Sequence, residues 1–155
     1  MNWRSRLHLA LDPALSIEIE DERYLGSKGH RAAAVLIAIT DRLEPGVILT
    51  QRPTWLRSHA GQVAFPGGKV DDGDENNIAA ALREAHEELN LPPAQVDIIG
   101  VADTYISGSG YSISPVVGVI PPDLSLQANP EEVEDWFEVP LAFLFDPANS
   151  IKKQA

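Results

Sequence analysis

Three glutamates, Glu84, Glu87 and Glu88, stand close enough in the sequence to act together. On a helix, residues three and four apart are neighbours, so all three carboxylates would lie within about one turn. Like charges at these spacings cost roughly 0.2–0.5 kcal/mol per pair, and Arg83 is expected to point about 100° away from them. Hard divalent cations prefer several carboxylate oxygens, so a metal site would explain the cluster. Taken alone, however, the glutamates favour a solvated acidic face.

The residues before the glutamates change this interpretation. The segment 65–69 (FPGGK) places a glycine pair ahead of the helix, where the backbone can approach a ligand closely. From Gly68 the chain runs through six residues to Glu75, and then through seven residues to REAHEELNL at 83–91. This pattern resembles the Nudix box, G-x5-E-x7-R-E-U-x-E-E-x-G-U, in which U is a bulky apolar residue.

The pattern departs from the Nudix box in three ways. One extra residue precedes Glu75, Ala85 is small for its position, and Asn90 replaces the last glycine. Asparagine is the best substitute for glycine in a left-handed helix cap, and the extra residue can be absorbed in the turn at 71–74. The resemblance implies an α/β fold, namely a Nudix-type α/β/α sandwich with a mixed central sheet and a loop–helix catalytic motif.

The same resemblance implies a site for Mg²⁺ or Mn²⁺. The metal ligands it implies are three carboxylates and one backbone carbonyl, those of Glu84, Glu87, Glu88 and Gly68. One of the glutamates, or a carboxylate from a loop, would take a proton from the attacking water. Arg83 and Glu75 are expected to pair and to steady the loop–helix junction. Glu132 is a further candidate base, although a solvated acidic turn is the better explanation for it.

A second motif narrows the substrate. Residues 48–68 (ILTQRPTWLRSHAGQVAFPGG) resemble the signature of coenzyme A pyrophosphatases, L-L-T-x-R-[SA]-x3-R-x3-G-x3-F-P-G-G, with Ile48 and Pro53 as the only departures. Further resemblance lies at 114–118 and 137–141. The implied reaction is metal-dependent hydrolysis of the pyrophosphate bond of coenzyme A and its thioesters, giving 3′,5′-ADP and (acyl-)4′-phosphopantetheine.

Four cationic or titratable residues cluster just before the acidic helix of an otherwise acidic chain: Arg52, Arg57, His59 and Lys69. Arginine suits bidentate phosphate contacts and lysine a point-charge contact. Without the motif, the arginines would be explained as surface ion pairs and His59 as structural. With it, all four are expected to bind substrate.

Three alternatives remain at this stage. The chain could hydrolyse ADP-ribose or another nucleoside diphosphate derivative, although the 52–61 motif argues against this. It could be a catalytically silent Nudix module that binds a nucleotide or a protein, although such modules often lose a glutamate of the box. The acidic helix could also be only an interaction surface.

Composition excludes several other classes. The 155 residues predict one domain with a short N-terminal segment at 1–28. A formal charge of −11 disfavours nucleic acid as a partner, and the absence of cysteine excludes disulfides and thiolate zinc sites. No apolar run approaches 18 residues, so a soluble cytoplasmic protein is expected. The family usually continues past residue 149 with a strand and a helix, so a truncated edge and a homodimer are further expectations.

The elements that would position these residues follow from local pattern. Strands are expected at Arg31–Thr40, 46–50, 96–105 and 113–120, a loop at 107–110, a short helix at 3–11 and a short apolar helix or turn at 140–145. The main helix is expected from about Glu75 to Leu89, capped by Asp72 or Asp74 and ended by Asn90. Its apolar stripe is Ile78, Leu82, Ala85 and Leu89.

Overall fold

The structure is a computed structural model that describes residues 31–55, 61–107 and 110–145. These residues form eight strands, two α-helices and one short 3-10 helix. In chain order the elements are β1 (Arg31–Thr40), β2 (Gly46–Gln51), β3 (Val63–Ala64), β4 (Gly67–Lys69), α3 (Asn77–Leu89), η1 (Pro93–Gln95), β5 (Asp97–Val101), β6 (Tyr105–Ile106), β7 (Tyr111–Ile120), β8 (Asp135–Pro140) and α4 (Leu141–Phe145).

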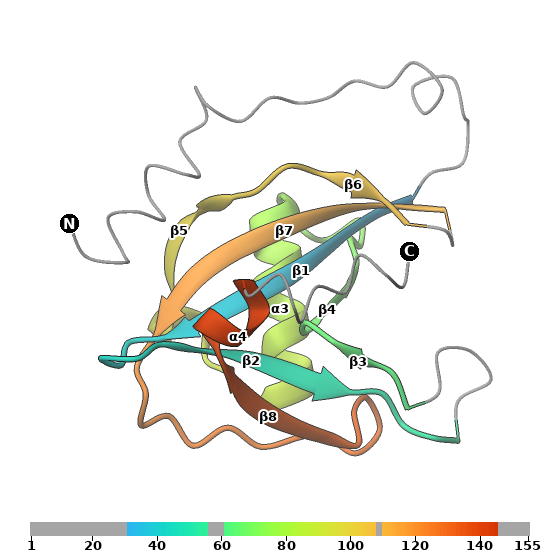
Figure 1. Cartoon of the computed structure of the whole chain (residues 1–155). Helices are drawn as coiled ribbons and strands as arrows, with labels where there is room; N and C mark the ends of the chain where they lie inside the picture. Colours follow the sequence, from blue (N-terminus) through green and yellow to red (C-terminus); the bar gives the residue numbers. More distant parts are fainter. Residues whose placement is uncertain (1–30, 56–60, 108–109, 146–155) are drawn as a thin grey trace.

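The strands form one mixed sheet (Figure 1). Its central pair is β1 and β7, which run parallel in unbroken register from Arg31 opposite Tyr111 to Thr40 opposite Ile120. The other pairings are antiparallel. On the side of β1 away from β7, β2 pairs near Ile39 and β4 pairs at 33–35. Because two strands divide one edge of β1, the sheet splits between β2 and β4.

The helix α3 packs on one face of this sheet. Alternate residues of β1, namely Ala34, Leu36 and Ala38, share a buried cluster with α3 residues, among them Ala81 and Leu89. Small side chains on both sides bring the helix close to the strands, and this closeness places its carboxylates against β4. The expected stripe is confirmed at Ala85 and Leu89, which are buried, whereas Ile78 and Leu82 are only partly buried.

The helix ends differ in part from expectation. Asn76, rather than Asp72 or Asp74, caps the N-terminus, because its side-chain oxygen accepts a hydrogen bond of 2.8 Å from the Ala79 N–H. The helix accordingly begins at Asn77. At the other end, Asn90 adopts the expected left-handed conformation with φ of 56°.

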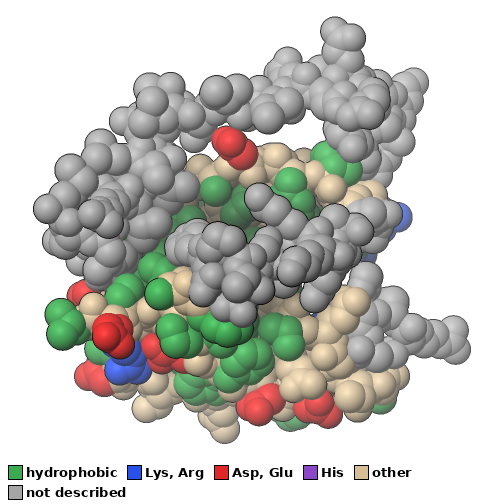
Figure 2. Space-filling model, in the orientation of Figure 1, with side chains coloured by type: hydrophobic (Ala, Val, Ile, Leu, Met, Phe, Trp, Pro, Cys, Tyr) green, Lys and Arg blue, Asp and Glu red, His purple; other side chains and the backbone are tan. Residues whose placement is uncertain are grey.

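The opposite face of the sheet holds a second apolar cluster. Ile39, Val47, Leu49 and Val117 are buried there, and Leu141 and Leu144 of α4 pack against them. In Figure 1, α4 lies in front of the sheet and α3 behind it, and Figure 2 shows hydrophobic side chains gathered on the front face around α4. The order of layers is therefore helix, mixed sheet and short helix.

The predicted strands at 31–40 and 46–50 are confirmed, and the one at 113–120 begins two residues early. The strand expected at 96–105 is shorter in the structure. It ends at Val101, after a register shift between Ile98 and Gly100. The strand β8 was not predicted from local pattern. The expected helix at 3–11 lies outside the described residues. Among the described helices, none is long and apolar enough to span a membrane.

Candidate active site

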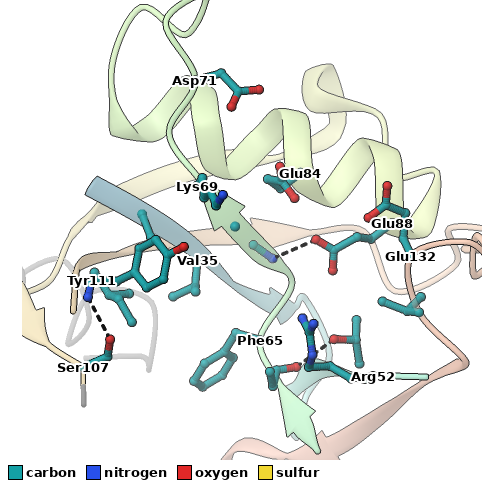
Figure 3. A pocket seen from close by; sticks show the side chains of 17 residues that line it. Val35, Arg52, Phe65, Lys69, Asp71, Glu84, Glu88, Ser107, Tyr111 and Glu132 are labelled. Atoms are coloured by element: carbon teal, nitrogen blue, oxygen red, sulfur yellow. Dashed lines mark hydrogen bonds between the residues drawn. The ribbon is translucent and has the colours of Figure 1, made fainter. Parts of the chain in front are cut away.

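A cavity of about 830 Å³ opens where the sheet splits beside α3 (Figure 3). Its wall includes backbone from β4 and side chains from β2, α3 and the loop that joins β7 to β8. The residues singled out from sequence that line it are Arg52, Gly68, Lys69, Glu84, Glu88 and Glu132. The fold therefore brings cationic and acidic groups into one concave site.

Glu88 is the most buried carboxylate of this site. Only 6% of the residue is exposed, and its Oε2 accepts a hydrogen bond of 3.2 Å from the Gly67 N–H. Burial raises the pKa of Glu88 to about 9, helped by a hydrogen bond between the Glu88 and Glu84 carboxyl groups and by the negative charges of Glu84 and Glu132. The solvated acidic face that the three glutamates favour on their own does not form at Glu88, because this side of α3 faces β4.

The glycine pair lets β4 fit between β1 and α3. A Cβ atom on Gly67 would collide with the Ala34 carbonyl, and one on Gly68 would lie 2.7 Å from Oε2 of Glu84. Backbone atoms therefore exclude a larger residue at Gly67, whereas at Gly68 the flexible Glu84 side chain would have to move. Gly68 keeps the backbone close to the Glu84 carboxylate.

Arg83 lies at the centre of an ion-pair network at the loop–helix junction. Its Nε and Nη2 donate to the two oxygens of Asp74, each at 2.9 Å, and its Nη1 donates to Glu84 at 2.8 Å and to Glu87 at 3.2 Å. Its Nη2 also donates to the Lys69 carbonyl at 3.1 Å. The hydrogen bonds from Arg83 lower the pKa of Asp74.

Two expectations about this junction were wrong. The arginine contacts both Glu84 and Glu87 rather than pointing away from them: Glu87 lies four residues on, on the same face of the helix, and the long side chain also reaches Glu84. Its acidic partners from the loop are Asp74 and, at 3.3 Å, Asp71, not Glu75, which is exposed. A turn closed by the Asp74 N–H and the Asp71 carbonyl folds Asp74 back under the guanidinium. The signal was present in the sequence, since Asp74 follows Gly68 after the five residues usual in the box.

The carboxylates suit a divalent cation in part. The carboxyl groups of Glu84 and Glu88 are hydrogen-bonded to each other, and two adjoining carboxylates are the donor chemistry that Mg²⁺ or Mn²⁺ would neutralise. The Glu87 carboxylate is exposed on Arg83 and does not line the cavity, so it would have to exchange that partner to join them. Within the described ranges, no three His, Cys, Asp or Glu side chains are grouped to hold a metal. Gly68 lines the cavity beside Glu84.

Arg52, an expected phosphate-binding residue, lines the wall of the cavity. Its backbone exchanges hydrogen bonds with Gln62 and Gly61, which closes the intervening segment. Its Nε is buried and has no hydrogen-bond partner among the described residues. Lys69 lies on the other side of the opening (Figure 3). Arg57 and His59 lie outside the described residues.

The loop between β7 and β8 contributes a group that sequence reasoning treated as secondary. Glu132 lies across the cavity from Lys69, on the same side as Glu88 (Figure 3). Tyr111 and Phe65 form a less polar part of the wall and were not singled out for this role. The position of Tyr111 at the start of a strand offered no local signal for a pocket.

Comparison of the sequence with known proteins finds relatives of this chain. The model of the NUDIX domain family matches residues 29–154. A protein described as an uncharacterized Nudix hydrolase, NudL, from Escherichia coli (strain K12) is 59% identical over 113 residues, which are 73% of this chain and 59% of the relative. A NudL of Shigella boydii serotype 18 has the same identity and coverage. The match thus spans about three fifths of the length of these curated relatives.

Solved structures share the fold at lower identity. A Nudix hydrolase from M. smegmatis, RenU, has a TM-score of 0.61 at 24% identity, covering 74% of this chain and 73% of that one. The NUDIX domain of Shewanella oneidensis NrtR, solved with ADP ribose, has a TM-score of 0.56 at 20% identity, covering 80% and 85%. At these identities the likeness concerns the fold alone.

Proposed function

Because the chain belongs to the NUDIX domain family, we propose that it is a metal-dependent hydrolase of nucleoside diphosphate derivatives, with coenzyme A and its thioesters as preferred substrates. Hydrolysis of the pyrophosphate bond would release 3′,5′-ADP and 4′-phosphopantetheine or its acylated form. The ADP-ribose class is the competing substrate, since one structure of the same fold carries that ligand.

The observation that carries the proposal is the position of the coenzyme A pyrophosphatase-like motif. Five of its fixed positions line the cavity that holds the acidic pair, namely Thr50, Arg52, Phe65, Gly67 and Gly68. If the motif served only folding, its fixed positions would not be expected to lie around one cavity. Its placement supports a role in substrate recognition.

Charge balance supports an anionic substrate. Burying part of a guanidinium without a partner is costly, so the Nε of Arg52 favours an anion as its partner. Lys69 offers a second cation at the opening. Coenzyme A carries a pyrophosphate and a 3′-phosphate, which would use both cations and the bound metal.

The carboxylates supply the remaining chemistry. We assign Glu84, Glu88 and the Gly68 carbonyl as metal-holding groups, with Glu87 joining after release from Arg83. A bound Mg²⁺ or Mn²⁺ would offset the charge of the pyrophosphate oxygens and lower the pKa of the attacking water. Arg83 and Asp74 hold the helix and β4 together so that the two carboxylates stay aimed at the cavity.

The test compares coenzyme A, 3′-dephospho-coenzyme A and ADP-ribose at equal concentration with Mg²⁺ or Mn²⁺, with products separated by chromatography. We expect the highest kcat/KM for coenzyme A and the appearance of 3′,5′-ADP. A higher kcat/KM for ADP-ribose would replace the substrate assignment. Absence of turnover on all three, with ligand binding retained, would identify a silent binding module.

A further inference from the structure

The loop between β7 and β8 completes the C-terminal end of α3, the helix that carries the carboxylates. The last four carbonyls of any helix lack partners within it. Here the His86 carbonyl accepts from the Asn90 N–H at 2.9 Å, as a left-handed cap provides. The other three, those of Glu87, Glu88 and Leu89, accept hydrogen bonds from residues 127–129 of the loop.

Asn129 supplies two of these three hydrogen bonds. Its backbone N–H donates to the Glu88 carbonyl at 2.8 Å, and its side-chain Nδ2 donates to the Glu87 carbonyl at 3.2 Å. One residue therefore binds the backbone of two neighbouring glutamates of the acidic helix.

The acceptor atoms of Asn129 organise the loop itself. Its backbone carbonyl accepts from the N–H groups of Glu132 and Val133, both at 2.9 Å, and its Oδ1 accepts from the Glu131 N–H at 3.2 Å. The turn that presents Glu132 is thus built on Asn129. Asn129 therefore joins the helix end to this turn.

The far side of the turn is anchored as well. Val133 is 2% exposed and belongs to the buried cluster around α3. The Glu134 N–H donates to the Gln51 carbonyl at the end of β2, at 2.8 Å. Glu132 therefore stands between two fixed points, with its side chain lining the cavity that Glu84 and Glu88 also line.

We propose that Asn129 is a positioning residue, which couples the end of α3 to the loop and so sets where the Glu132 carboxylate stands relative to Glu88. This inference rests on the proposed hydrolase function and extends it. Asn129 does not touch the reacting atoms; it acts through Glu132. A residue that only caps the helix would affect stability but would not act through that carboxylate.

A double-mutant comparison separates these roles. Asn129→Ala and Glu132→Gln are made singly and together, and Gln127→Ala is the loop control, because Gln127 contacts the helix only through its backbone N–H. Kinetics are measured on the substrate that the wild type turns over best, and Tm is recorded for every variant. We expect Asn129→Ala to lower kcat about ten- to a hundredfold, as loss of an orienting partner commonly does, with a smaller change in KM.

In the Glu132→Gln background, the same substitution should lower kcat by less than about twofold, because the group it positions is already lost. Gln127→Ala should match the wild type. Equal losses of kcat in both backgrounds, or an unchanged kcat in folded Asn129→Ala, would overturn the inference while leaving the hydrolase function intact. A wild type without turnover would overturn both. If Asn129→Ala does not fold, Asn129→Asp, which keeps the Oδ1 acceptor and removes the donor, takes its place with the same expectations.

Discussion

Asp74 and Arg83 form a two-pronged ion pair, with Oδ1 to Nε and Oδ2 to Nη2 both at 2.9 Å. This geometry matches the fork of the guanidinium to the two carboxylate oxygens. Arg83 then reaches Glu84 and the Lys69 carbonyl from the same side chain. The pair therefore ties the acidic turn, β4 and α3 together just beside the carboxylates of the cavity.

Replacing Asp74 should damage the site far more than replacing its neighbour. Asp74→Ala frees Arg83 to move, so we expect a lower Tm and a loss of about ten- to a hundredfold in kcat/KM. Glu75→Ala is the matched control, because Glu75 is the exposed neighbour of Asp74, and Asp74 makes the ion pair with Arg83. Thermal melts and steady-state kinetics on both variants check this, and equal losses would restore Glu75 to the role expected from the family pattern.

Neutralising the acidic pair should abolish most activity and leave the fold intact. Glu84→Gln or Glu88→Gln removes a metal-holding oxygen, which we expect to cost about a thousandfold in rate. Without metal the Tm should be unchanged or higher, because a contact between two acidic side chains is relieved. Glu131→Gln serves as the control, since Glu131 is exposed and does not line the cavity. Near-normal turnover by either variant would remove that residue from the site.

The metal-free protein should lose stability as the pH rises. The pKa of Glu88 is raised from 4.5 to about 9 in the folded state, chiefly by burial. Between those values the folded state binds more protons than the unfolded state, so the free energy of unfolding falls with increasing pH. We expect Tm to decline from about pH 5 to about pH 9 in the wild type and to decline less in Glu88→Gln. Parallel pH profiles for the two proteins would contradict the assignment.

Mg²⁺ provides a second check on the same group. Saturating Mg²⁺ stabilises the ionised carboxylate, so it should raise Tm most at high pH and flatten the decline of the wild type. The Tm measurements should be made above about pH 5. At lower pH the protonation of Asp74, whose pKa is lowered by Arg83, also reduces the stability of the fold. A Tm shift of the same size in Glu88→Gln would mean that Mg²⁺ binds elsewhere.

A methyl group on Gly68 should displace a carboxylate without unfolding the protein. The added Cβ would meet the far end of the flexible Glu84 side chain, which can move aside. We expect Gly68→Ala to fold and to lose about a hundredfold in kcat, since a shift of about 1 Å at a reacting site has that effect. Gly73→Ala, where a Cβ meets nothing within 4 Å, should behave like the wild type. Comparable kcat values for the two variants would show that Glu84 tolerates displacement.

Arg52 should distinguish coenzyme A from its dephosphorylated form. If its guanidinium binds the 3′-phosphate, Arg52→Ala should lower the affinity for coenzyme A about ten- to a hundredfold. This is the loss expected when one charge-assisted hydrogen bond, worth roughly 1.5–3 kcal/mol, is removed. The kcat/KM for 3′-dephospho-coenzyme A should fall far less. Arg57→Ala is assayed beside it. Equal losses on both substrates would place these arginines on the pyrophosphate or in loop packing.

Much of the fold could be predicted because its core segments have strong local patterns. The run Arg31–Thr40 is apolar and β-branched and is bounded by polar residues, so its strand was predicted with the correct ends. β8 was missed because its sequence, DWFEVP, mixes charged and apolar residues without clear alternation. The segment becomes a strand by pairing with β2, which lies far from it in the sequence, so a short stretch of sequence does not predict it.

The site was harder to predict where side-chain direction depends on neighbours. Helical spacing placed Glu84, Glu87 and Glu88 together, but it could not tell that β4 would bury Glu88 and leave Glu87 on Arg83. Local periodicity also gave no reason to weigh Asn129, because the helix end that it completes lies about 40 residues earlier in the chain.

The parallel pairing of β1 with β7 has a consequence for biosynthesis. β1 finds its long partner only about 80 residues later, so it cannot complete the centre of the sheet until Ile120 has left the ribosome. At about 5–20 residues per second, the apolar strand waits roughly 4–16 s, which is long for a segment prone to associate with other chains. Closing so large a loop also slows spontaneous refolding. A nascent chain halted before residue 111 should therefore be held by chaperones, whereas one released after β8 should fold without them.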